Sequence, residues 1–365
     1  MNNTDNDLSI YFHWPFCRSK CPYCDFFSRV KKNIDPKEII DGYLQQLERY
    51  ADLLPKRKIV SVFFGGGTPS LIEPKYIEAL LDKINSLWGL KTQAEISLEA
   101  NPNTQTPTLF QDLHLAGINR LSLGVQSLDE SNLKFLGRTH SKNEALQAIN
   151  DVLKNFDNHS VDLMYALPHQ TKSAWLQQLQ EISSFGLKHI SLYQLTIEEN
   201  TPFARKGILP LEEEQAAELY LATEDYLKEK NYHKYEVSNY ACDGFESIHN
   251  KAYWLGQDYI GIGETAHGRF KKDGHLFAQT NPLQLEELTP QERAEELIIM
   301  GLRLTKGLNK QNFEQISGIK FDTFINQTFK QEAITAKLLE ETSNTLKATQ
   351  SGFLVLDYLI TNLCC

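Results

Sequence analysis

The sequence has no long apolar segment and no excess of positive charge. No run of about 18 apolar residues occurs in the 365 residues, which argues against a membrane-spanning helix. Lysine and arginine total 37 against 47 aspartate and glutamate residues, and the net charge of −10 disfavours a nucleic-acid surface. The polar, acidic start lacks both parts of a secretory signal. We therefore expect a soluble, cytoplasmic protein that binds no nucleic acid.

Cysteine is scarce, but its distribution is informative. The chain has six cysteines, and Cys17, Cys21 and Cys24 lie within eight residues of one another. This clustering favours a metal site over a disulfide framework. Zinc normally takes four Cys or His ligands, and the nearby His13 lies in a strand-like segment, so zinc is the weaker alternative. Thiolates also bind iron–sulfur clusters, and three thiolates on a four-iron cluster would leave one iron open to a substrate.

Six short segments are predicted to be strands, because each is rich in β-branched or aromatic residues and is bounded by Gly, Pro or Asn. They are Leu8–Trp14, Lys58–Phe64, Ala94–Glu99, Asn119–Val125, Ser160–Tyr165 and His189–Thr196. Helical stretches lie between them, such as Pro36–Leu54 with Asp35 as its cap. Alternating strands and helices indicate parallel βαβ units. The predicted fold is therefore α/β, a partial (β/α)6 TIM-type barrel smaller than the eight-stranded form.

Unusual residues follow the predicted strands at their carboxyl ends, where such folds place their chemistry. The glycines 65–67 let the backbone approach a ligand and present N–H groups to an anionic group. Glu99 is suited to binding hydroxyls or an amine, or to capping the next helix. Asp162 stands in an apolar segment and needs partners, so we interpret it as a ligand. Arg138 also fits an ordinary surface position.

The spacing Cys17-x3-Cys21-x2-Cys24, with Tyr23 before the third cysteine, resembles the cluster loop of radical S-adenosylmethionine (SAM) enzymes. The order of Tyr11-x-His13-x-Pro15-Phe16-Cys17, Gly65–Pro69, Glu99-x-Asn101-Pro102, Gly124–Gln126 and Asp162-x4-Leu167-Pro168 is similar to one group within them. That group contains the oxygen-independent coproporphyrinogen III oxidases and their relatives, the haem (heme) chaperones of the HemW type. The resemblance spans roughly residues 8 to 360.

This resemblance implies a 4Fe–4S cluster held by Cys17, Cys21 and Cys24, with SAM bound at the open iron. In the family the reduced cluster cleaves SAM, and whether this chain turns SAM over stays open. The positions that match the group's cluster and SAM contacts are Tyr11, Tyr23, Gly66, Gly67, Thr68, Glu99, Gln126, Arg138 and Asp162. The radical chemistry needs the low end of the range of cluster potentials. The resemblance also extends the predicted fold to the radical SAM class of barrels.

Three features favour the chaperones over the oxidases. Phe26 stands where the oxidase has a fourth cysteine, and only ten residues precede Tyr11, whereas the oxidase has a long extension there. His249 begins a His-Asn-x-x-Tyr-Trp sequence that resembles the chaperones' haem-binding signature, and His267 is a second candidate iron ligand. The resemblance thus implies haem as cargo and haemoproteins of the respiratory chain as acceptors, with contact at the membrane surface as one setting. The alternative is an oxidase that decarboxylates coproporphyrinogen III, so the question of enzyme activity stays open.

The chain divides by pattern into a radical SAM core (1–235), a connecting segment with the His-Asn-x-x-Tyr-Trp motif (236–285) and a small, mostly helical carboxyl-terminal domain of the oxidase type (286–365). In that domain Pro290–Leu304 and Asn309–Ile316 are predicted as amphipathic helices, and Gly352–Leu356 as a short strand or wing. We interpret the domain as a lid or partner surface. Cys364 and Cys365 are expected to be exposed, and pairing as a homodimer is left open.

Overall fold

The structure is a computed structural model, and it describes residues 6–31, 35–103 and 108–364. In this part of the chain, twelve strands form one sheet in the order β14-β13-β12-β11-β1-β4-β5-β6-β7-β8-β10-β9. The parallel centre consists of β1 (Asp7–Trp14), β4 (Lys58–Gly66), β5 (Leu90–Ala100), β6 (Arg120–Gln126), β7 (Asn158–Tyr165) and β8 (His189–Gln194). The sheet is curved but open, because β14 and β9 remain its two edges. The predicted partial (β/α)6 barrel is confirmed.

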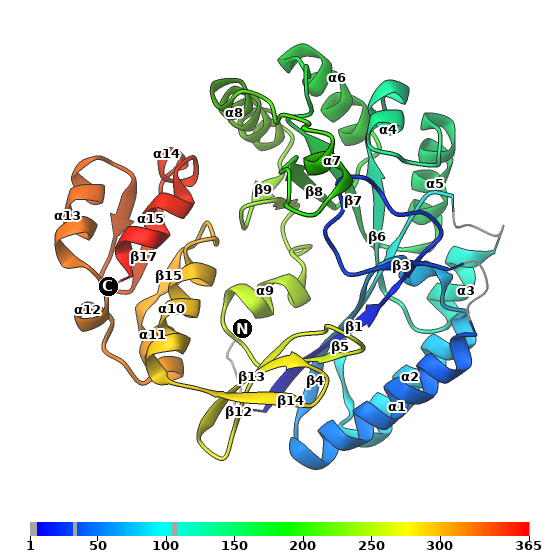
Figure 1. Cartoon of the computed structure of the whole chain (residues 1–365), viewed down its shortest axis with the longest axis horizontal. Coiled ribbons are helices and arrows are strands. Elements are labelled where there is room, and N and C mark those ends of the chain that lie inside the picture. The colour runs from blue at the N-terminus through cyan, green and yellow to red at the C-terminus, as the bar shows by residue number, and fades with distance from the viewer. Residues whose placement is uncertain (1–5, 32–34, 104–107, 365) are drawn as a thin grey trace.

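Helices cover the outside of the curved sheet (Figure 1). They are α1 (Pro36–Leu53), α2 (Pro74–Leu87), α3 (Leu109–Leu115), α4 (Glu130–Phe135), α5 (Lys142–Asn155), α6 (Lys172–Ser183) and α8 (Glu213–Glu229). Helix α1 begins where the sequence predicted, because the Asp35 carboxylate accepts a hydrogen bond from the backbone N–H of Lys37 at 3.0 Å. Its buried face carries Ile40, Tyr43 and Leu47. The Tyr43 hydroxyl donates to the His13 carbonyl at 2.6 Å and ties α1 to the end of β1.

The strands alternate in polarity, with apolar residues outward and polar residues inward. Outward residues such as Ile10, Val62 and Leu98 belong to the main hydrophobic core under the helices. Neighbouring strands align their polar residues in register: Ser9 pairs with Ser61, Ser61 with Glu95, and Glu99 with Ser122. A period of two places such residues on one face of each strand. The interior of the barrel is therefore lined with polar side chains.

The segment after α8 extends this sheet on both sides. It contributes β9 (His233–Lys234), β10 (Asn239–Ala241), α9 (Ile248–Trp254), β11 (Tyr259–Ile262), β12 (Gly268–Lys272), β13 (His275–Asn281) and β14 (Gln284–Leu288). Strand β11 pairs in parallel with β1, and β12, β13 and β14 follow as antiparallel strands. Helix α9 lies against the inner face of the barrel, where His249 contacts Ser61. The proposed boundaries at 235 and 285 stay a prediction.

The remaining chain packs around a second, smaller hydrophobic cluster, which includes Leu297, Phe313 and Leu346. Its elements are α10 (Pro290–Gly301), β15 (Leu308–Asn309), α11 (Lys310–Ser317), α12 (Phe321–Phe324), α13 (Gln327–Thr335), β16 (Leu339–Glu341), β17 (Thr345–Ala348), α14 (Gln350–Phe353) and α15 (Leu356–Leu363). The two predicted helices are confirmed as α10 and α11. Among the described residues, no helix is both long and apolar enough to cross a bilayer.

Two predictions for the end of the chain need correction. The segment 352–356 is not a strand or wing but the junction of α14 and α15, because Thr349 caps α14 by accepting from the Gly352 N–H. A Cβ at Gly352 would lie 2.0 Å from the Leu338 carbonyl oxygen, so this glycine serves a close approach of two backbones. Cys364 is partly buried against the second cluster rather than exposed. Cys365 lies outside the described residues.

Candidate functional site

The three clustered cysteines lie on a loop whose ends are joined by a small parallel sheet. Strand β2 (Phe16–Cys17) pairs with β3 (Arg29–Val30), so the intervening residues form a closed loop. Its centre is fixed to the barrel, because the backbone N–H of Phe203, in α7 (Pro202–Arg205), donates to the Pro22 carbonyl at 3.0 Å. In Figure 1 this dark blue loop lies over the barrel beside α7. The fold thus presents the cysteines at the carboxyl ends of the parallel strands.

The cysteine loop and the strand ends enclose a pocket of about 390 Å³, here called the cysteine pocket. Almost all of the residues predicted to contact a cluster or SAM line it: Cys17, Cys21, Tyr23, Cys24, Gly66, Gly67, Thr68, Glu99, Gln126, Arg138 and Asp162. The exception is Tyr11, which lines a different cavity deeper in the barrel together with His249, the predicted haem contact. The geometry therefore brings together residues that are more than 140 positions apart in the chain. Their individual roles stay predictions.

The glycines after β4 form a cradle for backbone rather than a free anion site. The Gly67 N–H donates to the Trp14 carbonyl at 2.7 Å, and the Thr68 N–H donates to the Phe16 carbonyl at 2.8 Å. A Cβ at Gly67 would lie 2.5 Å from the Phe16 carbonyl oxygen, closer than atoms approach without bonding. The expectation that the N–H groups of the glycines face an anionic ligand is therefore wrong for Gly67. Both amides instead hold the start of the cysteine loop.

Two carboxyl groups, Glu99 and Asp162, face the cysteine pocket from adjacent parts of the sheet. Burial raises the pKa of Glu99 to about 8, and the neighbouring Asp162 adds to this effect. Burial also raises the pKa of Asp162, although the Ser122 hydroxyl lies 3.0 Å from each of its carboxylate oxygens and stabilises the charged form. Two buried acids so close together favour a ligand that offers hydroxyl or ammonium donors. The amino group and ribose of SAM supply such donors.

Arg138 connects the cysteine loop to the strand ends. Its guanidinium donates to the Cys21 sulfur at 3.5 Å, to the Asn101 side-chain oxygen at 2.5 Å and to the Gly124 carbonyl at 2.8 Å. Its Nε is buried without a hydrogen-bond partner in the described chain. From the sequence alone, Arg138 also fitted an ordinary surface position. In the structure it lines the cysteine pocket. A hydrogen bond to sulfur is the type of contact that tunes an iron–sulfur cluster.

The donor set fits a cluster better than a single metal ion. In the described residues, no three His, Cys, Asp or Glu side chains converge closely enough to hold one ion. A four-iron cluster does not need such convergence, because its cysteines bind separate irons. Burial, with Cys21 and Cys17 close by, raises the pKa of the Cys24 thiol to about 11, so metal binding has to displace its proton. Three thiols and the orphaned Arg138 Nε are therefore compatible with a cluster and its ligand.

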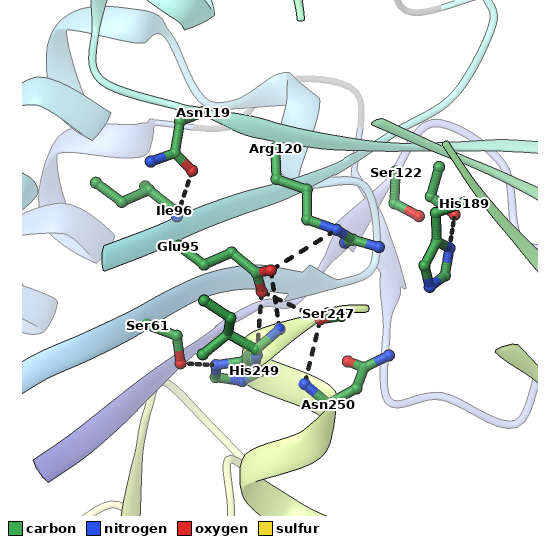
Figure 2. Close-up of polar contacts among 12 residues, drawn as sticks. Ser61, Glu95, Ile96, Asn119, Arg120, Ser122, His189, Ser247, His249 and Asn250 are labelled. Carbon is green, nitrogen blue, oxygen red and sulfur yellow. Dashed lines mark hydrogen bonds and ion pairs between the residues drawn. The ribbon is translucent and has the colours of Figure 1, made fainter. Parts of the chain in front are cut away.

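A polar chamber of about 160 Å³ lies deeper in the barrel, and Figure 2 shows its centre. Arg120 lines it with only 2% of its surface exposed, and its Nε lies 3.9 Å from Glu95. Glu95 accepts hydrogen bonds from the Ser247 hydroxyl and from the N–H groups of Ile248 and His249, so it caps α9. The sequence analysis did not single out Arg120. A charged residue within an apolar strand, the signal that identified Asp162, would have found it.

His249 is held by this chamber through both ring nitrogens. Its Nδ1 lies 2.9 Å from the Ser61 hydroxyl, and its Nε2 is hydrogen-bonded to the Tyr253 hydroxyl. Burial lowers the pKa of His249 to about 3, so the ring is neutral at ordinary pH. An iron ligand needs one free imidazole nitrogen. His249 as a haem contact stays a prediction, and direct ligation would require it to give up one of these bonds.

A third cavity lies between the cysteine loop, α9 and α10, and we call it the aromatic pocket. It measures about 560 Å³ and is lined by Tyr11, His13, Asp25, Phe26, Phe27, Tyr253, Trp254, Tyr259, Thr265, His267 and Met300. Tyr253 and Trp254 are the last two residues of the His-Asn-x-x-Tyr-Trp motif. Asp25 and Phe26 line both this pocket and the cysteine pocket, so the two cavities share a wall. The sequence analysis did not identify Phe27, Tyr259 or Met300.

Comparisons with known proteins agree with this geometry. Residues 11–182 match the radical SAM superfamily, and residues 288–355 match the HemN C-terminal domain. The chain is 36% identical to "Heme chaperone HemW" of Haemophilus influenzae and 35% identical to the protein of that name of Buchnera aphidicola from Schizaphis graminum, with 97% of each chain covered. It is also 35% identical to "Radical S-adenosyl methionine domain-containing protein 1, mitochondrial" of Danio rerio, over 96% of this chain and 82% of that one.

Among solved structures, the chain is similar to coproporphyrinogen III oxidase (HemN) from Escherichia coli, with a TM-score of 0.81 and 20% identity. The match covers 98% of this chain and 89% of that one. At that identity the similarity shows a common fold, but it does not show a common activity. The curated relatives are similar over nearly the full length and at higher identity. The chain therefore belongs to the HemW family of the radical SAM superfamily.

Proposed function

We propose that this protein is a haem chaperone that holds a 4Fe–4S cluster and SAM in the cysteine pocket, and that binds haem and transfers it to acceptor haemoproteins. The observation that carries the proposal is the shared wall between two different cavities. One presents three thiols and two carboxyl groups, and the other is apolar and aromatic. A cavity of several hundred Å³ lined by aromatic side chains suits a large flat ligand. The names of the curated relatives support haem as that ligand.

Each group in the cysteine pocket has a task that follows from its position. Cys17, Cys21 and Cys24 would bind three irons of the cluster, and Arg138 would donate a hydrogen bond to the Cys21 sulfur. When bound, the reduced cluster supplies one-electron chemistry. Glu99 and Asp162 would accept hydrogen bonds from the amino and hydroxyl groups of SAM. The loop itself shields the site, because β2 and β3 close it over the strand ends.

The alternative function, that of an oxidase acting on coproporphyrinogen III, is less favoured. Phe26, at the position of the oxidase's fourth cysteine, places an aromatic ring in the wall between the pockets. The relatives of higher identity are named as heme chaperones, whereas the oxidase is only 20% identical. The acceptors, contact with a membrane surface and pairing as a homodimer remain predictions. The cytoplasmic location also remains one, because curated relatives include proteins named as mitochondrial.

The direct test of this function is a transfer assay. The anaerobically reconstituted full-length protein is loaded with haem, separated from free haem and mixed with an apo-haemoprotein such as apomyoglobin. We expect the acceptor's haem spectrum to develop faster than it does when the same amount of haem is supplied on serum albumin. A parallel incubation with coproporphyrinogen III, SAM and reductant should yield no protoporphyrinogen. Failure of haem to bind saturably, or formation of protoporphyrinogen, would overturn the proposal.

A further inference from the structure

A chain of hydrogen bonds crosses the interior of the barrel from the cysteine pocket to the start of α9. It begins at Asp162 of β7, whose Oδ1 lies 3.3 Å from the Ser160 hydroxyl. The Ser160 hydroxyl lies 2.7 Å from Nδ1 of His189 on β8, and Nε2 of His189 lies 2.8 Å from the Tyr235 hydroxyl. The Tyr235 oxygen accepts the backbone N–H of Ser247, the cap of α9, at 3.3 Å. The chain thus connects a carboxyl group of the cysteine pocket with the helix that carries the His-Asn-x-x-Tyr-Trp motif.

His189 is the middle of this chain and is fully buried in the interior of the barrel (Figure 2). Burial lowers its pKa well below the usual value, and the positive charge of Arg120 and the nearby His159 add to this effect. The ring is therefore neutral and carries a single N–H, so it donates at one nitrogen and accepts at the other. The nitrogen that holds the proton fixes the direction of every hydrogen bond in the chain.

With Asp162 ionised, all of the donors in the chain point toward its carboxylate. The Ser247 N–H donates to the Tyr235 oxygen, and the Tyr235 O–H donates to Nε2 of His189. The Nδ1–H of His189 then donates to Ser160, whose O–H donates to the carboxylate. Each donor finds an acceptor, which is the arrangement that buried polar groups favour.

With Asp162 protonated, the same chain can run in the opposite direction. The carboxylic acid donates to the Ser160 oxygen, and the Ser160 O–H donates to Nδ1 of His189. The Nε2–H then donates to Tyr235, whose own O–H is left without an acceptor among the described residues. A buried donor without a partner costs free energy, so this direction favours opening of the contact between Tyr235 and α9. The chain therefore has two arrangements, and the charge on Asp162 selects between them.

We propose that His189 is a positioning residue that couples the charge on Asp162, in the cysteine pocket, to the start of α9. This inference rests on the proposed function, because it takes SAM as the ligand of the cysteine pocket. SAM carries a sulfonium and an ammonium group, and a cation near Asp162 favours the carboxylate form. Binding of SAM should thus select the first direction of the chain and tighten the start of α9, which carries His249.

The groups that face Asp162 leave its charge open to change by a ligand. Burial raises the pKa of Asp162, whereas Arg120 of β6 and the serine hydroxyls around the carboxylate act against this effect. Glu99 of β5 and Tyr193 of β8 are titratable groups that also face it, and neither adds a positive charge. A bound cation would therefore shift the balance toward the carboxylate.

The test measures hydrogen exchange of the backbone amides 247–254 in the full-length protein with its cluster reconstituted, without SAM and with saturating SAM. His189→Phe removes both ring nitrogens from the chain. Ser160→Ala and Tyr235→Phe break the same chain on either side with smaller changes, and they serve where His189→Phe does not fold. We expect SAM to slow the exchange at least about fivefold in the unaltered protein and less than about twofold in these variants.

Two matched controls separate this coupling from the loss of a buried hydroxyl. Ser122→Ala removes a hydroxyl that lies 3.0 Å from each Asp162 carboxylate oxygen but takes no part in the chain. Tyr232→Phe removes a buried hydroxyl that donates to the Leu187 carbonyl at 2.8 Å. In both controls, saturating SAM should still slow the exchange at least about fivefold.

SAM binding is measured in the same samples, so that lost coupling is distinguished from lost binding. The inference is overturned if SAM binds to the unaltered protein without slowing the exchange, or if it slows the exchange equally in Ser160→Ala and Tyr235→Phe. Loss of the slowing in the two controls as well would also overturn it, because the effect would then reflect general stability. Failure of SAM to bind the reconstituted, unaltered protein would instead refute the proposed function.

Discussion

The cysteine pocket and the aromatic pocket share a wall but are built in different ways. The cysteine pocket lies over the ends of parallel strands, and its residues come from successive βα connections of one sheet. The aromatic pocket joins the cysteine loop, α9, the β11–β12 connection and α10, so it needs both hydrophobic clusters of the protein to be in place. The first is a standard position for chemistry in such folds. The second depends on contacts between distant segments, and this difference suggests separate tasks for the two pockets.

The largest expected effect separates the two pockets outright. Replacing Cys17, Cys21 and Cys24 together by serine should abolish the iron–sulfur absorption after anaerobic reconstitution, because too few thiolates remain. Haem binding should persist, since none of the three lines the aromatic pocket. Cys242→Ser serves as the control, because Cys242 packs against the main core and lies outside both pockets. Retention of the cluster in the triple variant, or loss of both the cluster and haem binding, would contradict the assignment of the two ligands to separate pockets.

A smaller but still large effect is expected at the base of the cysteine loop. Gly67→Ala would place a Cβ 2.5 Å from the Phe16 carbonyl oxygen and force β2 away from the glycine cradle. Overpacking of this kind costs about 1–3 kcal/mol of unfolding free energy, measurable by denaturant titration. Gly42→Ala is the control, because nothing lies within 4 Å of its Cβ in the middle of α1. It should stabilise the protein by about 0.5–1 kcal/mol. Equal changes in unfolding free energy for the two substitutions would contradict the close contact between Gly67 and the Phe16 carbonyl.

The pH dependence of stability gives the next effect. With a pKa of about 8 in the folded protein against an ordinary 4.5, Glu99 keeps its proton on folding but loses it on unfolding between these values. Its contribution to stability therefore falls as pH rises from 4.5 to 8. Glu99→Gln should be more stable than the unaltered protein at pH 8. The difference in unfolding free energy should grow by no more than about 1.4 kcal/mol for each pH unit above 4.5. The two melting temperatures should converge near pH 4.5, and a difference independent of pH would contradict the assignment.

The smallest effect concerns the shared wall. Phe26 is 65% exposed, so Phe26→Ala should leave the melting temperature almost unchanged. It should weaken haem binding severalfold, because an aromatic contact contributes about 1 kcal/mol. Leu209→Ala, at a residue 77% exposed and outside both pockets, is the control in the haem titration. Equal haem affinity of the two variants would place the haem elsewhere.

The sequence predicted those parts of the molecule that depend on local pattern. The six strands, the cap at Asp35 and the two helices α10 and α11 follow from periodicity and capping chemistry, and the structure confirms them. Residues at the strand ends, such as Glu99, could be grouped because the carboxyl ends of parallel strands meet. Arg120 was missed, although a charged residue within its otherwise apolar strand was a signal. Its ion pair with Glu95 could not be predicted, because it depends on the register that places Arg120 beside Ser97 of β5.

The aromatic pocket could not be predicted in the same way. Its walls combine Phe27, Tyr259 and Met300, whose proximity depends on how β11 and α10 pack against the barrel. The sequence also could not show that Ser61 and Tyr253 occupy both nitrogens of His249, because hydrogen-bond partners across a barrel have no local signature. The correction at Gly352 has the same origin, since the close approach to Leu338 is a tertiary contact.

The most direct test of the central claim is a stoichiometric titration of haem into the full-length protein with its cluster reconstituted, followed by metal analysis and spectroscopy. The account predicts one haem bound for each chain with the cluster signal unchanged, because the two ligands occupy separate pockets that share only a wall. Displacement of the cluster by haem, or haem binding only to the protein without its cluster, would contradict it.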